Sequence, residues 1–263
     1  MIREIGSGAR RGLTSAMARV RAERYARRPG RMTVGVGTRL AFDPGTADAH
    51  YARGDVELPV QEALAARLHP GGVFYDVGAN VGFFTVIGAR LGGATGRVVA
   101  LEPVPANAAL IRRNCDLNGF GGVLVIEQAA SDSIGIGELI LARHSGGAAL
   151  STASRPVDAT TTIDVELTTI DALVDELALP PTLVKIDVEG AELAVLTGMA
   201  DTLARHRPTI VCEIDDGDRR RYQEKHDECV DLLEESGYRI TELADSYPGS
   251  TWSVGHFVAD PIS

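Results

Sequence analysis

The chain lacks three features that would place it in a membrane, in a disulfide framework or on nucleic acid. No apolar run in its 263 residues is long enough to span a bilayer, and the N-terminus lacks the apolar core of a secretory signal. The three cysteines cannot form an even set of disulfides, which suits a reducing compartment. The formal net charge of −10 argues against nucleic-acid binding by the whole surface. We therefore expect a cytoplasmic protein without a nucleic-acid partner and without stable membrane insertion.

Positive charge is nevertheless concentrated at the N-terminus. Residues 1–31 contain nine arginines but only two acidic residues. In this segment Leu13, Met17 and Val20 are spaced to form a narrow apolar stripe on a helix. The stripe lacks Trp and Phe, which favours packing on the main domain or on a second subunit over binding to a membrane surface or RNA. We expect residues 1–55 to be a helical, Arg-rich extension that acts as a lid or as a homo-oligomer contact.

The remainder, residues 56–263, is predicted to be one doubly wound α/β domain. Apolar strands such as Val73–Val77 alternate with amphipathic helices, a pattern typical of a mostly parallel sheet covered on both faces. A less regular insertion at 131–168 carries only short β-like pieces. The predicted helices after the insertion are Ile170–Leu177, Ala191–Leu203 and Asp218–Ser236. Two final strands, Tyr238–Leu243 and Ser253–Ala259, are close enough in sequence to pair antiparallel.

Residues 73–82, Val-Phe-Tyr-Asp-Val-Gly-Ala-Asn-Val-Gly, predict a strand, a tight turn and the start of a helix. Gly78, Asn80 and Gly82 leave little bulk in the turn, so a ligand can approach the backbone. Free N–H groups at the helix start favour an electronegative partner. Asp76, on the strand, can accept hydrogen bonds from an ammonium or a hydroxyl group. The turn is therefore predicted to hold a small polar cofactor.

Two cofactor classes use a glycine-containing turn at this point of such a sheet. Dinucleotides favour the spacing G-x-G-x-x-G, which is absent here and disfavours an NAD-type oxidoreductase. Asp76 can serve the amino-acid end of S-adenosylmethionine, and Glu102, at the end of the second strand, can accept both ribose hydroxyls. Asp132 follows the third strand, where it suits either an adenine amino group or a loop cap. Together these positions favour S-adenosylmethionine.

The motifs at these positions resemble the FkbM-type S-adenosylmethionine-dependent methyltransferases. The resemblance rests on Phe74–Gly82, on Ala130-Ser131-Asp132 and on Val184-Lys185-Ile186-Asp187-Val188-Glu189-Gly190-Ala191-Glu192, and it covers about residues 56–259. It implies a seven-stranded Rossmann-like sheet with an antiparallel last strand. It also implies methyl transfer, often to a hydroxyl of a sugar or secondary metabolite. The residues assigned to cofactor binding are Asp76, Gly78, Asn80, Gly82, Glu102, Ser131, Asp132 and Asp187.

Acidic residues gather where the acceptor is expected, beyond the carboxyl ends of the central strands. Asp187 follows the strand Leu183–Ile186 and is predicted to be the general base; Glu213, near the end of a strand over Thr209–Ile214, would hold an acceptor hydroxyl. His144, in the insertion, is a second candidate base. Asp187 and Glu213 are alternatively ligands for a divalent cation such as Mg²⁺. Glu192 is expected only to stabilise a helix N-terminus, whereas for Glu189 the choice between that role and a role in the site stays open.

The sequence thus predicts an S-adenosylmethionine-dependent methyltransferase that methylates a hydroxyl oxygen. The acceptor is expected to be a sugar or a hydroxylated secondary metabolite. One alternative is a methyltransferase-like scaffold without enzymatic activity, which would bind partners through the arginine-rich arm. The other alternative is the NAD-type oxidoreductase that the glycine spacing disfavours.

Overall fold

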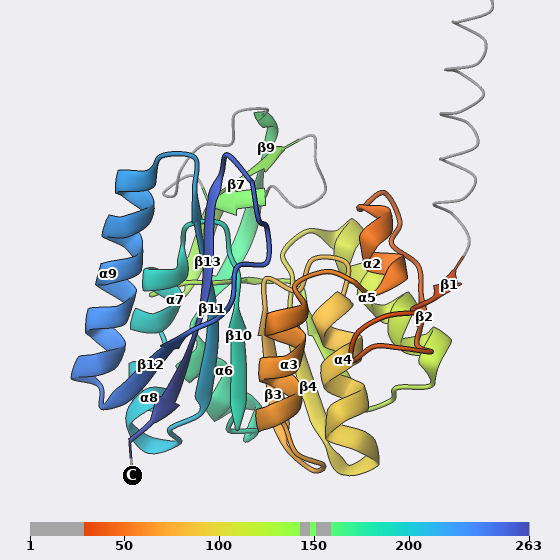
Figure 1. Ribbon diagram of the computed structural model, residues 1–263. Helices are drawn as coiled ribbons and strands as arrows, with labels where there is room; N and C mark the ends of the chain where they lie inside the picture. The colour runs from red at the N-terminus through yellow and green to blue at the C-terminus, as the bar shows by residue number, and fades with distance from the viewer. Residues whose placement is uncertain (1–28, 143–147, 151–158, 263) are drawn as a thin grey trace, which may run out of the picture.

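A computed structural model describes residues 29–142, 148–150 and 159–262 (Figure 1). Within this part of the chain, the main sheet has seven strands in the order β12-β13-β11-β10-β3-β4-β5. The strands are β3 (Val73–Val77), β4 (Arg97–Leu101), β5 (Val123–Ile126), β10 (Leu183–Ile186), β11 (Thr209–Asp216), β12 (Tyr238–Glu242) and β13 (Ser253–Pro261). Neighbouring strands are parallel except that β13 runs antiparallel to both β11 and β12. The predicted doubly wound sheet with an antiparallel last strand is confirmed.

Helices cover both faces of this sheet because successive strand residues point to opposite sides. Phe74 packs in one core with α3, α4 and α5, whereas Tyr75 packs in a second core with the later helices. The first face is covered by α3 (Leu58–Arg67), α4 (Phe83–Gly92) and α5 (Pro105–Asn118), with a 3₁₀ turn at Gly93–Thr95. The second face is covered by α6 (Ile170–Leu177), α7 (Glu192–Thr197), α8 (Ala200–Arg205) and α9 (Arg219–Glu235).

The insertion is more ordered than the sequence indicated. It forms a second sheet, with four strands among the described residues in the order β6-β9-β7-β8. These strands are β6 (Ala129–Ala130), β7 (Gly135–Ala142), β8 (Ala148–Leu150) and β9 (Ala159–Thr168). Leu139 and Val165 are buried against Ala129 and Ala191, so the short β-like pieces extend into a long antiparallel pair with a small core of its own.

The helix predicted over Ala191–Leu203 is wrong, because two short helices, α7 and α8, replace it. Gly198 separates them and lies against the backbone of Ser131. A Cβ atom on Gly198 would stand only 2.0 Å from the Ser131 carbonyl oxygen. The chain therefore needs glycine at this contact, and the close approach of the second sheet ends the first helix.

Residues 30–55 pack on the domain, although the sequence analysis grouped them with the N-terminal extension. They form β1 (Gly30–Arg31), β2 (Ala41–Phe42) and α2 (Ala49–Arg53). Phe42 is fully buried and meets the ring of Phe83 edge to face at 5.9 Å. The apolar stripe near the N-terminus lies outside the described residues. No helix in the described ranges is both long and apolar enough to cross a membrane.

Candidate active site

The turn between β3 and α4 brings the chain into direct contact with the end of β10. Gly78 has a φ of +80°, and a Cβ atom there would lie 1.8 Å from the Asp187 carbonyl oxygen. Asn80 also has a left-handed backbone, with a φ of 49°, and Gly82 begins α4 with a φ of 85°. The turn therefore needs glycine at Gly78 and Gly82, and Asn80 is of a residue type that tolerates a left-handed backbone. The three predicted turn residues lie together as expected.

Asp76 lies beneath this turn and is almost fully buried. Its Oδ2 accepts a hydrogen bond from the Thr85 hydroxyl at 2.5 Å, whereas its buried Oδ1 has no hydrogen-bond partner among the described residues. Burial raises the pKa of Asp76 to about 6, against the lowering effects of Lys185 and Thr85. A buried carboxylate oxygen without a partner is costly, so this atom is suited to a ligand that donates a hydrogen bond.

Glu102, at the end of β4, holds the turn from the other side. Its carboxylate accepts hydrogen bonds from the Asn80 N–H at 2.8 Å and from the Val104 N–H at 2.9 Å. Burial raises its pKa to about 7. Each carboxylate oxygen can accept more than one hydrogen bond, so this arrangement leaves room for hydroxyl donors.

Ser131 and Asp132 lie at the junction of the two sheets. Both line a cavity of about 430 Å³ whose wall also includes Glu192 of α7 and Cys229 of α9. Ser131 is buried, while the exposed Asp132 carboxylate accepts a hydrogen bond from the Ser133 hydroxyl at 3.0 Å. This contact joins two side chains, so the choice between a loop cap and a ligand contact for Asp132 stays open. Its assignment to adenine stays a prediction.

A row of charged side chains crosses the face of the sheet that α3 and α4 cover. Lys185 pairs in register with Asp76 on β3, and Glu213 pairs in register with His256 on β13. All four share a face with the core residues two positions before or after them, such as Phe74. The charged groups thus lie toward the carboxyl ends of the parallel strands, where the sequence analysis expects ligands to bind.

Lys185 is the buried cation of this row. Its Nζ lies 2.8 Å from Asp187 Oδ2 and 4.7 Å from the centre of the Phe84 ring. Burial alone would lower the pKa of Lys185, but the carboxylates of Asp187, Glu57, Asp76 and Glu213 outweigh burial and raise it. The ammonium group therefore stays charged and ties the row together.

Asp187 is the more open partner of that ion pair, with 26% of its side chain exposed. Its backbone N–H donates to the Val77 carbonyl at 3.1 Å, which fixes Asp187 beside the turn between β3 and α4.

Glu192 accepts a hydrogen bond from the Gly190 N–H at 2.8 Å and so stabilises the start of α7, as the structural alternative for this residue predicted. Burial, followed by the charge of Asp215, raises the pKa of Glu189 to about 10.

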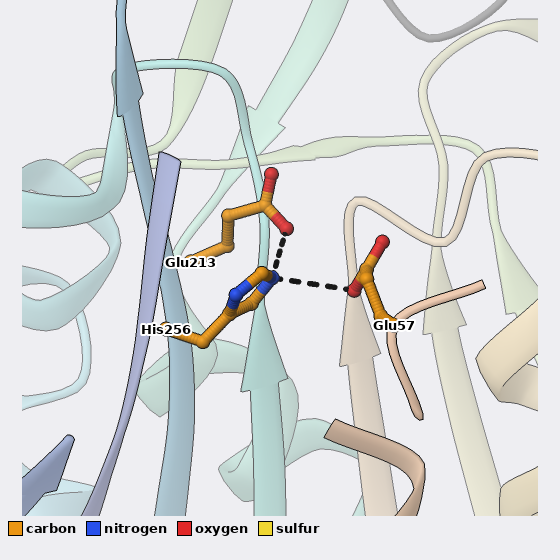
Figure 2. Close-up of side chains that lie close together, drawn as sticks. All are labelled: Glu57, Glu213 and His256. Atoms are coloured by element: carbon orange, nitrogen blue, oxygen red, sulfur yellow. Dashed lines mark hydrogen bonds and ion pairs between the residues drawn. The ribbon is translucent and has the colours of Figure 1, made fainter. Parts of the chain in front are cut away.

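Glu213 forms a compact cluster with His256 and Glu57, as Figure 2 shows. His256 Nε2 lies 2.6 Å from Glu213 Oε2 and 3.4 Å from Glu57 Oε2. Burial alone would lower the pKa of His256, but its contacts with the two carboxylates raise the pKa to about 10. Burial, followed by the charges of Asp187 and Glu57, raises the pKa of Glu213. The two carboxylates therefore favour the protonated form of His256.

The structure revises one expectation about these residues. Glu213 lies inside β11, which extends to Asp216, so its neighbour is the opposing strand residue His256. The described residues that gather donor atoms for a metal around Glu213 are Glu57 and His256, whereas Asp187 pairs with Lys185. The assignment of Asp187 and Glu213 to a divalent cation stays a prediction. His144 lies outside the described residues.

Three residues of the site were missed from the sequence: Glu57, Lys185 and His256. Lys185 had a readable signal, because it is a charge within the otherwise apolar four-residue strand β10. Glu57 had none, since it contacts His256 across 199 positions of sequence, and only the three-dimensional fold brings them together.

Comparison with known proteins gives the family. The model of the methyltransferase FkbM domain matches residues 76–240. The FkbM 31-O-demethyl-FK506 methyltransferase of Streptomyces tacrolimicus is 28% identical over 242 residues, which cover 78% of this chain and 90% of that protein. A ribosomal protein L11 methyltransferase of Pelotomaculum thermopropionicum is 30% identical over 112 residues, so the match spans only 36% of each protein.

Solved structures agree on the fold. A putative rRNA-methylase from Clostridium thermocellum superposes with a TM-score of 0.53 at 14% identity, covering 77% of this chain and 93% of that one. At this identity the similarity concerns the fold alone, which supports the Rossmann-like assignment of the main sheet. Because the family model covers more than half of the 263 residues, including the turn, the Asp187 block and β11, the chain belongs to the FkbM methyltransferase family.

Proposed function

We propose that this protein transfers the methyl group of S-adenosylmethionine to a hydroxyl oxygen of a sugar or secondary-metabolite acceptor. The observation that carries the proposal is the contact between the turn that would hold the cofactor and Asp187, where the acceptor would lie. The turn at Gly78 touches the backbone of Asp187, so a cofactor on the turn and an acceptor at Asp187 would be neighbours. The name of the Streptomyces tacrolimicus relative also describes methylation of an oxygen.

The residues around the turn fit the amino-acid and ribose ends of the cofactor. The unpartnered Oδ1 of Asp76 would accept from its ammonium group, and Glu102 would accept from its ribose hydroxyls. Asn80 and Gly82 keep the backbone close to the ligand, and Ser131 and Asp132 would contact its adenine. When bound, S-adenosylmethionine supplies a sulfonium methyl group, which the acceptor oxygen displaces in line while the C–S electron pair leaves to sulfur.

Asp187, Lys185 and Glu213, at the carboxyl ends of the strands, would orient the acceptor hydroxyl and remove its proton. Asp187 has the partly open carboxylate of the row, and we assign it as the base that takes the hydroxyl proton. Lys185 holds this carboxylate in place through the 2.8 Å ion pair. Glu213 lies farther along the same face, where it would orient the acceptor. General bases of this kind contribute about 10²–10⁴-fold to a rate.

Replacement of one atom tests this assignment. We expect Asp187→Asn to lower kcat at least about a hundredfold while the affinity for S-adenosylhomocysteine changes little, because a base acts on the acceptor and not on the cofactor. Asp201→Asn, at an exposed ion pair with Arg205, is the matched control and should keep full turnover. Turnover of Asp187→Asn equal to that of the control would remove Asp187 from the mechanism.

Calorimetry separates the alternatives. Binding of S-adenosylhomocysteine without binding of NAD is expected for the proposed enzyme. Binding of neither ligand would favour the scaffold, and binding of NAD alone would favour the oxidoreductase.

A further inference from the structure

We propose that Glu57, Glu213 and His256 bind a divalent first-row transition-metal ion, of the Mn²⁺ or Zn²⁺ type. The cluster combines two carboxylates and one imidazole that come from three distant parts of the chain: the start of α3, the strand β11 and the strand β13. Carboxylate oxygen and imidazole nitrogen are ordinary ligands for these ions.

The donor atoms are spaced for a small ion. One atom from each residue lies within 4.8 Å of the other two. Metal–ligand bonds of about 2.1 Å in tetrahedral geometry place two ligand atoms roughly 3.4 Å apart. His256 Nε2 and Glu57 Oε2 already stand 3.4 Å apart, and Glu213 Oε2 lies 2.6 Å from the same nitrogen. A shift of the Glu213 carboxylate by less than about 1 Å would therefore open the centre.

Glu57 supplies the independent evidence for a ligand. It is 5% exposed, and its Oε2 is buried without a hydrogen-bond partner in the described part of the chain. This oxygen meets His256 Nε2 in an ion pair at 3.4 Å, which Figure 2 shows and which is longer than a hydrogen bond of ordinary geometry. A buried carboxylate oxygen with only this long contact is poorly compensated for burial, and a metal ion between Glu57 and His256 would meet it directly. The backbone at Glu57 is also held left-handed, with a φ of 45°.

Tyr247 supports the cluster from outside. Its hydroxyl donates to Glu57 Oε1 at 2.8 Å, and its ring stacks on the ring of His256 at 6.2 Å. Hydrogen bonds of this type orient carboxylate ligands around metals. The second carboxylate oxygen of Glu57 is thereby directed toward His256 and Glu213.

The charge of the row favours a divalent ion. Four carboxylates, those of Asp76, Asp187, Glu57 and Glu213, lie around two buried basic side chains, Lys185 and His256, so negative groups outnumber positive ones. An ion with two positive charges would offset part of this excess while leaving His256 neutral, the form in which it can bind metal. The nitrogen ligand favours Mn²⁺ or Zn²⁺ over Mg²⁺, which prefers oxygen ligands and retains several waters.

The role of the ion rests on the proposed function, whereas its binding does not. An ion at this site would act as a Lewis acid on the acceptor hydroxyl and lower the pKa of that group. The released proton would pass to Asp187. The side chain of Glu213, 14% exposed, is the most open of the three ligands and marks the direction from which an acceptor would reach the ion.

Mn²⁺ and Zn²⁺, each supplied alone, test the site. Titration of the chelator-treated full chain with Mn²⁺, followed by electron paramagnetic resonance, should give one ion per chain with an imidazole-nitrogen modulation in the echo decay. His256→Gln and Glu57→Gln should each weaken Mn²⁺ binding at least about tenfold, the loss expected when a metal site loses a ligand or its support. His226→Gln is the matched control, because His226 forms a similar pair with Glu242 at 2.9 Å but belongs to no metal cluster among the described residues.

Binding of neither Mn²⁺ nor Zn²⁺, absence of the nitrogen modulation in Mn²⁺-loaded wild-type protein, or equal binding by wild type and His256→Gln would each overturn the proposal. The wild-type spectrum answers the question even if a variant fails to fold. Methyl transfer is measured separately on the same samples. One bound ion without any methyl transfer would leave the metal site standing and refute the proposed function.

Discussion

The contact between Gly78 and Asp187 predicts that one methyl group can separate the two halves of the site. In Gly78→Ala the new Cβ would stand 1.8 Å from the Asp187 carbonyl oxygen, where ordinary contacts begin at 3.4 Å. The backbones must therefore move apart by about 1.6 Å, the difference between these two distances. The two atoms nearest to the added Cβ are the carbonyl oxygen and carbon of Asp187. Both belong to the backbone, so no side-chain rotation can relieve the overlap.

The expected magnitude has two parts. A left-handed backbone costs an alanine about 1–2 kcal/mol, which for a chain of this size lowers Tm by roughly 2–8 °C. Gly119→Ala carries only this part, because its φ of +71° is similar and no atom lies within 4 Å of the added Cβ. Gly78→Ala adds the displacement of the turn from Asp187. A misplacement of about 1 Å in a catalytic site can cost about 10²-fold in rate.

Thermal unfolding and calorimetry with S-adenosylhomocysteine measure the two parts. We expect Gly119→Ala to lose some stability and to bind the ligand normally. Gly78→Ala should lose more stability and bind at least about tenfold more weakly. Equal Tm values and equal ligand affinities for the two variants would refute the reasoning. Such a result would mean that the turn at Gly78 is not closely packed against Asp187.

Three further predictions concern pH and stability. Burial raises the pKa of Asp76 to about 6 and that of Glu102 to about 7, and a cationic or hydroxyl donor favours the ionised forms. Ligand binding should therefore release protons, and S-adenosylhomocysteine affinity should fall from about pH 8 to about pH 5; a flat calorimetric profile would contradict this. Arg67→Gln removes a partly exposed pair with Asp260 at 2.8 Å, and should lower Tm by about 1–4 °C with unchanged turnover. Phe42→Ala should cost about 3–5 kcal/mol in a denaturant titration, and a loss below about 1 kcal/mol would show that residues 30–55 are not part of the core.

The cofactor half of the site could be predicted because its signals are local. Asp76, Gly78 and Asn80 lie within five consecutive positions, and a strand, a turn and a helix start each have a short sequence pattern. The antiparallel end of the sheet followed from two strands separated by a short connection. These features depend on neighbours in sequence, which one chain displays directly.

The acceptor half could not be predicted in the same way. His256 meets Glu213 because β13 pairs with β11 in a particular register, and no pattern within either strand fixes that register. Glu57 joins them only through the packing of α3 on the sheet. Gly198 marks the break between α7 and α8, but its cause is the backbone of Ser131, which follows β6 and is far from Gly198 in sequence. Long-range packing determines each of these contacts.

Transfer of an isotopically labelled methyl group tests the central claim most directly. The full-length protein would be incubated with labelled S-adenosylmethionine and a panel of glycosides and hydroxylated metabolites, and the products analysed by mass spectrometry and nuclear magnetic resonance. The account predicts label on a hydroxyl oxygen of at least one acceptor, and loss of that product in Asp187→Asn. Label found only on nitrogen or carboxyl groups would contradict it.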